Sequence, residues 1–163
     1  MRSRVPYRVQ VAVTLRDYAP ADLEALWRLD QECYASGIAY SKRELRGYLS
    51  LRGAECLIAE QDGFIAGFVL AEHAREFAHI ITIDVAERAR RIGIGSALLE
   101  ETERRLAARG VREAELETAT NNLGAIAFWQ RHGYRTEGVI PRYYLGRIDA
   151  YAMRKRLPAA KEI

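Results

Sequence analysis

The chain has 163 residues, of which 49% are hydrophobic and 29% charged, with a formal net charge of +3 at pH 7. Its longest mostly apolar run, Gly63 to Ala71, is shorter than the roughly 20 residues that span a bilayer, and Met1 to Gln10 lacks the apolar segment of a signal peptide. We therefore expect a soluble cytoplasmic protein that does not contact membranes, in which Cys33 and Cys56 are packing residues rather than part of a disulfide framework.

Hydrophobic periodicity predicts one mixed α/β domain over residues 10–158, long enough to bury about two-thirds of its unfolded surface. Residues 1–9 show no clear pattern and are expected to form a loose extension, and residues 159–163 a short tail. The predicted helices end near Cys33, Gly53, Arg109 and His132. The predicted strands cover residues 10–15, 55–60, 64–72, 79–85, 112–119, 134–139 and 148–157.

Local patterns support individual parts of this prediction. Ser41 and Glu44 form a capping box, because the serine hydroxyl can accept from the Glu44 amide while the glutamate reaches back to the Ser41 amide. The tripeptide Gln61-Asp62-Gly63 indicates a hairpin turn between two antiparallel strands. The helix over 123–132 is apolar nearly all round, so we expect it to be enclosed in the interior.

The strand over 79–85 runs into a basic turn that contains three arginines between residues 88 and 91, followed by Gly93 and Gly95. Successive amides at two residues without Cβ, at the positive end of a helix dipole, can bind a diphosphate. Glycines needed only for a tight strand-to-helix turn are the alternative explanation. A Rossmann site would add Glu117 as a ribose ligand, but Leu98 stands where its third glycine is required.

Basic residues also cluster at 154–156, yet no recognition-helix pattern accompanies either cluster, so we expect no nucleic-acid partner.

The stretch from Ile83 through Arg90-Arg91-Ile92-Gly93-Ile94-Gly95 resembles the acetyl-coenzyme A motif of the GNAT superfamily of N-acetyltransferases, (Arg/Gln)-x-x-Gly-x-(Gly/Ala) after a strand. The similarity covers roughly residues 13–157. Within the superfamily the chain is most similar to the ribosomal-protein alanine and other protein N-terminal acetyltransferases, whose Arg-x-Tyr-Tyr-like segment is matched by Arg142-Tyr143-Tyr144. Further matching segments are Leu116-Glu117, Asn122, Ala125-Ile126, Gly133-Tyr134 and Asp149 to Met153.

The resemblance implies a mixed, mostly antiparallel sheet of six or seven strands, with one splayed parallel pair and four flanking helices. Acetyl-CoA would then act as co-substrate without a metal, its pantetheine arm pairing with the backbone of Ile83, Asp84 and Val85. An amide near Val85 would stabilise the oxyanion. The implied pyrophosphate contacts are Arg90, Arg91, Ile92, Gly93, Ile94, Gly95 and Ser96, and Asn122 and Trp129 are implied along the cofactor arm. Asn122 equally suits a helix N-cap.

For catalysis, the resemblance implies Glu117 as the base that removes a proton from the acceptor amine, with His79 as a second candidate. The alternative for Glu117 is a third exposed glutamate on its strand, and His79 fits a solvent-facing or structural histidine better than a base. The position seven after Asn122 usually holds a tyrosine that protonates the leaving thiolate, but here it is Trp129, whose indole is no such acid. We expect Tyr144 or water to supply that proton.

Aromatic residues predict where the acceptor binds. Tyr34 and Tyr40 flank one loop, Tyr143 and Tyr144 lie in another, and the two resemble walls that hold a peptide N-terminus. Both pairs equally suit loop anchors. We expect a protein or peptide α-amine as acceptor and a monomer or homodimer. The alternatives are a small-molecule amine, such as a polyamine or antibiotic, and a non-catalytic acyl-CoA-binding module.

Overall fold

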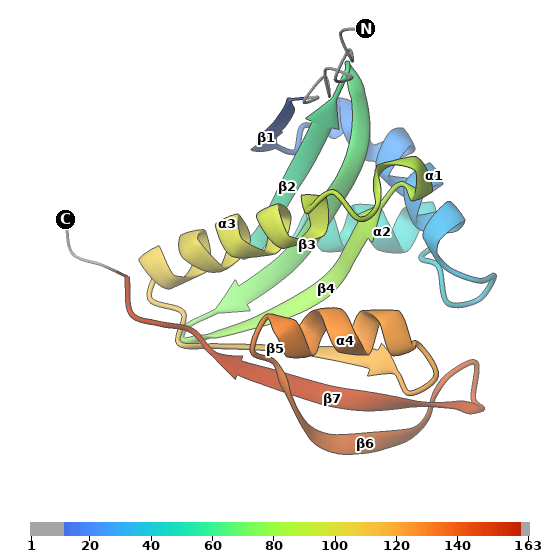
Figure 1. Ribbon diagram of the computed structural model, residues 1–163, viewed down its shortest axis with the longest axis vertical. Helices are drawn as coiled ribbons and strands as arrows, with labels where there is room; N and C mark the ends of the chain where they lie inside the picture. Colours follow the sequence, from blue (N-terminus) through green and yellow to red (C-terminus); the bar gives the residue numbers. More distant parts are fainter. Residues whose placement is uncertain (1–11, 161–163) are drawn as a thin grey trace, which may run out of the picture.

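The computed structural model describes residues 12–160, and its elements follow the predicted order (Figure 1). The expected extension over 1–9 and the end of the tail, 161–163, lie outside the described residues. The strands are β1 (Val13–Asp17), β2 (Ala54–Gln61), β3 (Phe64–Ala74), β4 (Phe77–Val85), β5 (Glu113–Ala119), β6 (Arg135–Tyr144) and β7 (Ile148–Arg156). The α-helices are α1 (Leu23–Cys33), α2 (Lys42–Leu49), α3 (Ile94–Ala108) and α4 (Leu123–Arg131), and short 3₁₀ turns cover Pro20–Asp22 and Glu87–Ala89.

The strands form one sheet in the order β1-β2-β3-β4-β5-β7-β6, in which only the β4–β5 pair is parallel. Helix α3 covers one face of β2 to β4, α1 and α2 cover the opposite face, and α4 lies over β5 (Figure 1). The core between these layers is formed by buried aliphatic and aromatic side chains, among them Leu26, Leu45, Phe68, Leu98 and Leu116. The predicted mixed sheet with a parallel pair and four helices is therefore confirmed. Within residues 12–160, none of the helices combines the length and apolar character needed to cross a bilayer.

The local signals form the structures that the sequence predicts. Ser41 Oγ accepts from the Glu44 amide at 3.1 Å, and Glu44 Oε2 accepts from the Ser41 amide at 2.8 Å. Asp62 and Gly63 both have positive φ, 51° and 76°, as a two-residue hairpin between right-twisted strands requires. Helix α2 ends at Leu49 rather than Gly53, because the chain turns back there and the Gly53 carbonyl accepts from the His73 amide.

Two expectations for the C-terminal half are wrong. The strand predicted over 134–139 is longer, since β6 continues through Tyr144. Pro141 is tolerated because β6 is the sheet edge and its register shifts beyond Ile140. Helix α4 is not enclosed: Trp129 alone among its residues is buried, and Leu123 is 76% exposed. One side of α4 borders an open cleft instead of packed protein.

The parallel pair separates soon after it begins. Strands β4 and β5 are paired only at Phe77–Glu113, Ala78–Ala114 and His79–Glu115. Next to this point the β3–β4 register shifts, so Ala71 pairs with Ile80 and Leu70 with Thr82, leaving Ile81 as a bulge. The two strands therefore diverge beyond His79 and open a gap in the middle of the sheet.

Candidate active site

The gap between β4 and β5 forms a cleft with a volume of about 980 Å³. Its walls come from Ile80 to Ile83 on β4, from Leu116 to Ala119 on β5, and from the N-terminal ends of α3 and α4. Beyond His79, β4 has no β5 partner, so main-chain groups that face the gap can pair with an extended ligand. The cleft is thus long and lined by backbone on one side, which suits the arm of a large cofactor.

The basic turn closes one end of this cleft. Arg91 and Gly93 have left-handed backbones, with φ of 66° and 89°, and α3 begins directly after them. A Cβ on Gly93 would meet no atom, so glycine is needed here for the left-handed backbone and not for lack of space. A Cβ on Gly95 would approach Phe128 Cε2 at 3.3 Å, so that glycine serves the packing of α3 on α4. Amides at the start of α3 can therefore face an anion.

The arginines of the turn have distinct roles. Arg90 Nε donates to the Val85 carbonyl at 3.0 Å and its Nη2 lies 3.7 Å from Cys33 Sγ, so this side chain ties the turn to β4 and α1. Arg88 stacks on the Phe64 ring, 3.7 Å from its centre, and does not line the cleft. Arg91 does line it. Among these three arginines, Arg91 is thus the one that lines the cleft and has no described side-chain or backbone partner, so its guanidinium is available to an anion.

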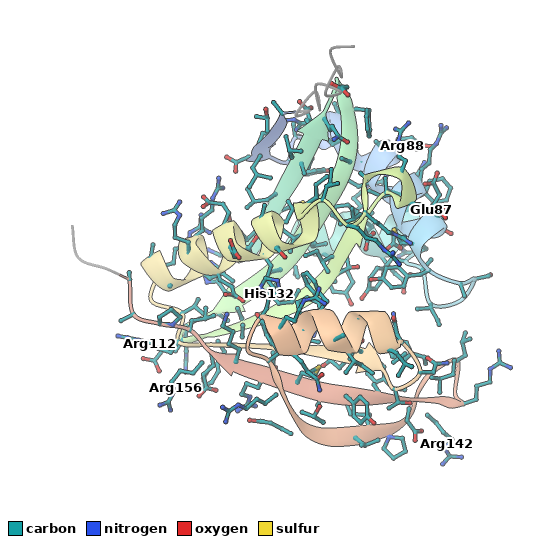
Figure 2. The ribbon with its side chains drawn as sticks, in the orientation of Figure 1. Glu87, Arg88, Arg112, His132, Arg142 and Arg156 are labelled. Atoms are coloured by element: carbon teal, nitrogen blue, oxygen red, sulfur yellow. The ribbon has the colours of Figure 1, made fainter. Side chains whose placement is uncertain are left out.

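Several cleft residues were missed by sequence reasoning. Arg131, at the end of α4, lines the cleft. His132 follows it and lies between α3 and α4 (Figure 2), where its Nε2 is 2.9 Å from Oγ of the predicted residue Ser96. Phe128 and Cys33 also line it. The adjacent basic residues Arg131-His132 after an apolar helix are a usable signal, whereas nothing local marks Cys33 or Phe128.

Glu117 and His79 meet where the strands separate. His79 Nε2 and Glu117 Oε2 are 2.6 Å apart, and both side chains are half-buried. The hydrogen bond with Glu117 raises the pKa of His79 above its ordinary value, although burial acts in the opposite direction. Glu117 lines the cleft and His79 stands behind it. The two residues that the sequence offers as candidate bases therefore form one dyad.

The other glutamates on the Glu117 face of β5 are held in ion pairs. Arg154 on β7 reaches Glu113 and Glu115, each at 3.3 Å, and also Glu137 at 3.3 Å. Glu113 and Glu115 are thus held by an arginine rather than left to solvent alone. Their pairing with one arginine leaves Glu117 as the carboxylate of this row that contacts a histidine and the cleft.

Tyr144 and Trp129 lie on the same cleft. Tyr144 ends β6, and burial raises the pKa of its phenol, so the hydroxyl keeps its proton through neutral pH. Trp129 is only 6% exposed and packs edge-on against Phe128 and Tyr134, with ring centres 5.1 and 5.3 Å away. Trp129 is therefore a packed wall, and Tyr144 is a hydroxyl donor facing the cleft.

The two aromatic loops, the loop over 35–40 and the β6–β7 turn, lie on the same side of the molecule (Figure 1), and Tyr34, Tyr40 and Tyr144, in or beside them, line the cleft. A Cβ on Gly37 would fall 2.5 Å from Leu145 Cδ2, so the loop over 35–40 touches the β6–β7 turn. The Tyr34 hydroxyl is 3.4 Å from the Ile83 carbonyl, which anchors it to β4. Tyr143 packs edge-on against Tyr144 with ring centres 4.8 Å apart.

Four further predicted residues are placed as follows. Asn122 Oδ1 accepts from the Ala125 amide at 3.1 Å, so it is the N-cap of α4, and it also lines the cleft. Ile83 and Val85 line the cleft, but the Asp84 side chain is buried on the α1 side and does not. Any cofactor contact of Asp84 is thus restricted to its main chain. In the described part of the chain, His, Cys, Asp and Glu side chains form no group of three suited to a metal ion.

Comparison with known proteins agrees with this geometry. The sequence profile of the acetyltransferase (GNAT) family matches residues 23–134. An uncharacterised N-acetyltransferase of Methanocaldococcus jannaschii is 30% identical over 148 residues, covering 90% of this chain and 94% of the relative. The ribosomal protein bS18-alanine N-acetyltransferase of Escherichia coli is 28% identical over 146 residues, covering 86% and 95%.

Solved structures show the same fold. The E. coli ribosomal-protein-S18-alanine N-acetyltransferase superposes with a TM-score of 0.84 at 27% identity, covering 93% of this chain and 97% of its own. Ard1 from Thermoplasma volcanium gives a TM-score of 0.84 at 26% identity, covering 91% and 99%.

Proposed function

Because this chain belongs to the acetyltransferase (GNAT) family, and is therefore an acyltransferase, we propose that it moves the acetyl group of acetyl-CoA to the N-terminal α-amine of a protein or peptide. The observation that carries the proposal is the Glu117–His79 dyad, which sits where β4 and β5 part, in a cleft that residues of the basic turn and of the two aromatic loops also line. Donor and acceptor would then meet at the dyad within one cleft.

The donor fits the residues that are present. The amides at the start of α3 suit its pyrophosphate, with Arg91 beside them, and the backbone of β4 suits its pantetheine amides. The Ile83 carbonyl already accepts from the Tyr34 hydroxyl but keeps a second lone pair, whereas the Val85 carbonyl accepts from both Arg90 Nε and the Cys33 thiol. Acetyl-CoA supplies an activated thioester carbonyl. The protein supplies its position and the proton transfers.

The acceptor must lose a proton for its nitrogen to attack. Glu117, which lines the cleft, takes that proton, and the hydrogen bond to His79 lets the dyad hold it as imidazolium beside carboxylate. The nitrogen then forms a bond with the acetyl carbon and releases its second proton to water as the carbon–sulfur bond breaks. Tyr144 gives its hydroxyl proton to the departing sulfur, in place of the tyrosine that Trp129 replaces. The phenolate of Tyr144 recovers its proton from water.

The shape of the cleft beside the two aromatic loops supports a peptide acceptor. Gly37 and Leu145 bring two loops into contact there, and Tyr40 and Tyr144 extend the cleft between them. Such a passage suits an extended chain whose terminus points at Glu117. The relatives support the same substrate, since the E. coli enzyme is named for ribosomal protein bS18 alanine and archaeal relatives are named N-alpha-acetyltransferases.

The experiment compares acetyl-CoA turnover with three acceptors: a peptide beginning with alanine, the same peptide with a blocked N-terminus and an internal lysine, and spermidine. We expect product from the free N-terminus, with mass spectrometry placing the acetyl group on its α-nitrogen. Turnover with spermidine and none with the free peptide would overturn the proposal in favour of a small-amine acetyltransferase. Acetyl-CoA binding without transfer to any of the three would overturn it in favour of a non-catalytic module.

A further inference from the structure

Two aspartates are buried against each other where α1 packs on β4. Asp30 is 0% exposed and Asp84 is 1% exposed, and the two carboxyls lie close enough that each acts on the pKa of the other. The groups that act on them in the described structure are acids, hydroxyls and an amide, with no cation among them. Two carboxylates in such a place cannot both be charged.

The hydrogen bonds of the pair identify where a shared proton lies. Asp30 Oδ2 accepts from the Tyr40 amide at 2.7 Å, and Asp84 Oδ1 accepts from the Thr82 hydroxyl at 2.7 Å. The other two oxygens, Asp30 Oδ1 and Asp84 Oδ2, have no other donor. One proton between these two oxygens satisfies both, which leaves the pair with a single negative charge.

The pair connects the two halves of the site. Through Asp30 it holds the amide of Tyr40, the last residue of the loop over 35–40, whose carbonyl is held in turn by Gln31 Nε2 at 2.7 Å. Through Asp84 it holds Thr82 on β4, whose hydroxyl is 3.3 Å from that of Tyr34. The loop that touches the β6–β7 turn is thus attached to the strand that lines the cleft.

We propose that Asp30 and Asp84 form a proton-sharing joint that positions the acceptor-facing loop over 35–40 relative to strand β4. They are positioning residues, because neither side chain lines the cleft. The role assigned to the loop rests on the proposed function, whereas the shared proton does not. Burial raises the pKa of both aspartates, which agrees with a retained proton at neutral pH.

The neighbouring groups do not supply the positive charge that the aspartate pair lacks. The titratable neighbours are Glu44 from α2, Tyr40 from the loop, and Cys33 and Tyr34 from the end of α1. Burial raises the pKa of the Cys33 thiol to about 11 and raises the pKa of the Tyr34 and Tyr40 phenols above their ordinary value, so all three groups are neutral at pH 7. Arg90, which adjoins Cys33, contacts Cys33 Sγ and the Val85 carbonyl rather than either aspartate.

Asparagine substitutions test the joint because they keep the shape and change the donors. In Asp30→Asn or Asp84→Asn, the new amide N–H₂ can donate to the remaining carboxylate, while its oxygen still accepts from Tyr40 or Thr82. The pair keeps one negative charge and a complete set of hydrogen bonds. In the double variant D30N/D84N, two N–H₂ groups face each other while both oxygens keep their donors, and this conflict is relieved only if the new amide at position 84 turns over and replaces the bond that Thr82 donates.

With the alanine-terminated peptide as probe, we expect each single variant to keep the acceptor KM within about threefold of wild type, and the double variant to raise it about tenfold or more at similar kcat. Acetyl-CoA affinity should change little in all three. A wild-type KM in D30N/D84N, or an increase in either single variant as large as that in the double, would overturn the proposal.

Two measurements need no acceptor and separate this proposal from the proposed function. Infrared difference spectra between wild type and D84N at pH 7 should show the carbonyl stretch of a protonated carboxylic acid, and its absence overturns the shared proton even if the double variant does not fold. Amide exchange at Tyr40 should accelerate in D30N/D84N but not in the single variants, and unchanged exchange contradicts the positioning. If wild type acetylates no peptide, the proposed function fails while these two results still decide the joint.

Discussion

At the scale of single residues, the dyad makes the clearest prediction. Glu117→Gln should lower kcat/KM about a hundredfold or more, because the amide cannot accept the amine proton. In wild type, kcat/KM should rise with pH as the dyad loses its proton, with a midpoint above the ordinary histidine value because Glu117 raises the pKa of His79. Steady-state kinetics across pH measure both effects.

Glu115→Gln is the matched control for this variant. Glu115 lies on the same face of β5, but it is paired with Arg154 and does not line the cleft. Its substitution should leave kcat/KM within about twofold of wild type, as expected for a half-exposed ion pair. Equal losses in E115Q and E117Q, or none in E117Q, would contradict the assignment of the base.

Tyr144→Phe tests the acid in the same way. Removing the hydroxyl should lower kcat by about tenfold, a modest loss because a thiolate leaves readily without help, while acetyl-CoA affinity stays unchanged. Rapid kinetics with separate measurement of cofactor binding distinguish the two quantities. Tyr143→Phe, on the neighbouring ring, should keep a wild-type kcat, and a larger loss there than in Y144F would show that the acid is assigned to the wrong residue.

At the scale of elements, the turn before α3 depends on the backbone of Gly93. Gly93→Ala should destabilise the fold by about 1 kcal/mol, because its φ of 89° disfavours any Cβ although no atom blocks one. The same strain should displace the α3 amides and weaken acetyl-CoA binding. Thermal unfolding and calorimetric titration measure the two consequences.

Gly47→Ala in α2 is the comparison that isolates this cause. A Cβ on Gly47 also meets no atom, but its backbone is helical, so alanine should stabilise the fold by about 0.5–1 kcal/mol without affecting acetyl-CoA. If Gly93→Ala also stabilised the fold and left acetyl-CoA binding unchanged, the turn would tolerate a side chain, and glycine would not be required at this position.

At the scale of the whole molecule, three residue pairs join the β4 and β5 halves of the sheet, and the cleft separates them beyond that point. A donor lying in the cleft contacts both halves. Acetyl-CoA at about a hundredfold excess over its Kd should therefore raise the free energy of unfolding by about 2.7 kcal/mol. Hydrogen exchange should slow most at residues 116–119 and 80–85, and protection confined to the α3 turn would argue against a cofactor arm between the strands.

Much of the fold follows from local pattern. The capping box at Ser41, the hairpin at Asp62-Gly63 and the burial alternation along β5 each depend on residues within a few positions of one another, so the sequence alone predicts them. The exposure of α4 does not follow in this way. Its apolar residues predict burial, but whether protein or an open cleft lies beside them depends on where β4 and β5 separate.

The sequence by itself determined the order of elements, the glycine turn with its basic residues, and the presence of Glu117, His79 and Tyr144 as candidate groups. Only the tertiary structure decided that Glu117 contacts His79 and that Asp30 meets Asp84. The reason is register: the pairing of β4 with β5 and the bulge at Ile81 set which side chains face each other across long separations. A pattern within one segment carries no record of how two segments are aligned.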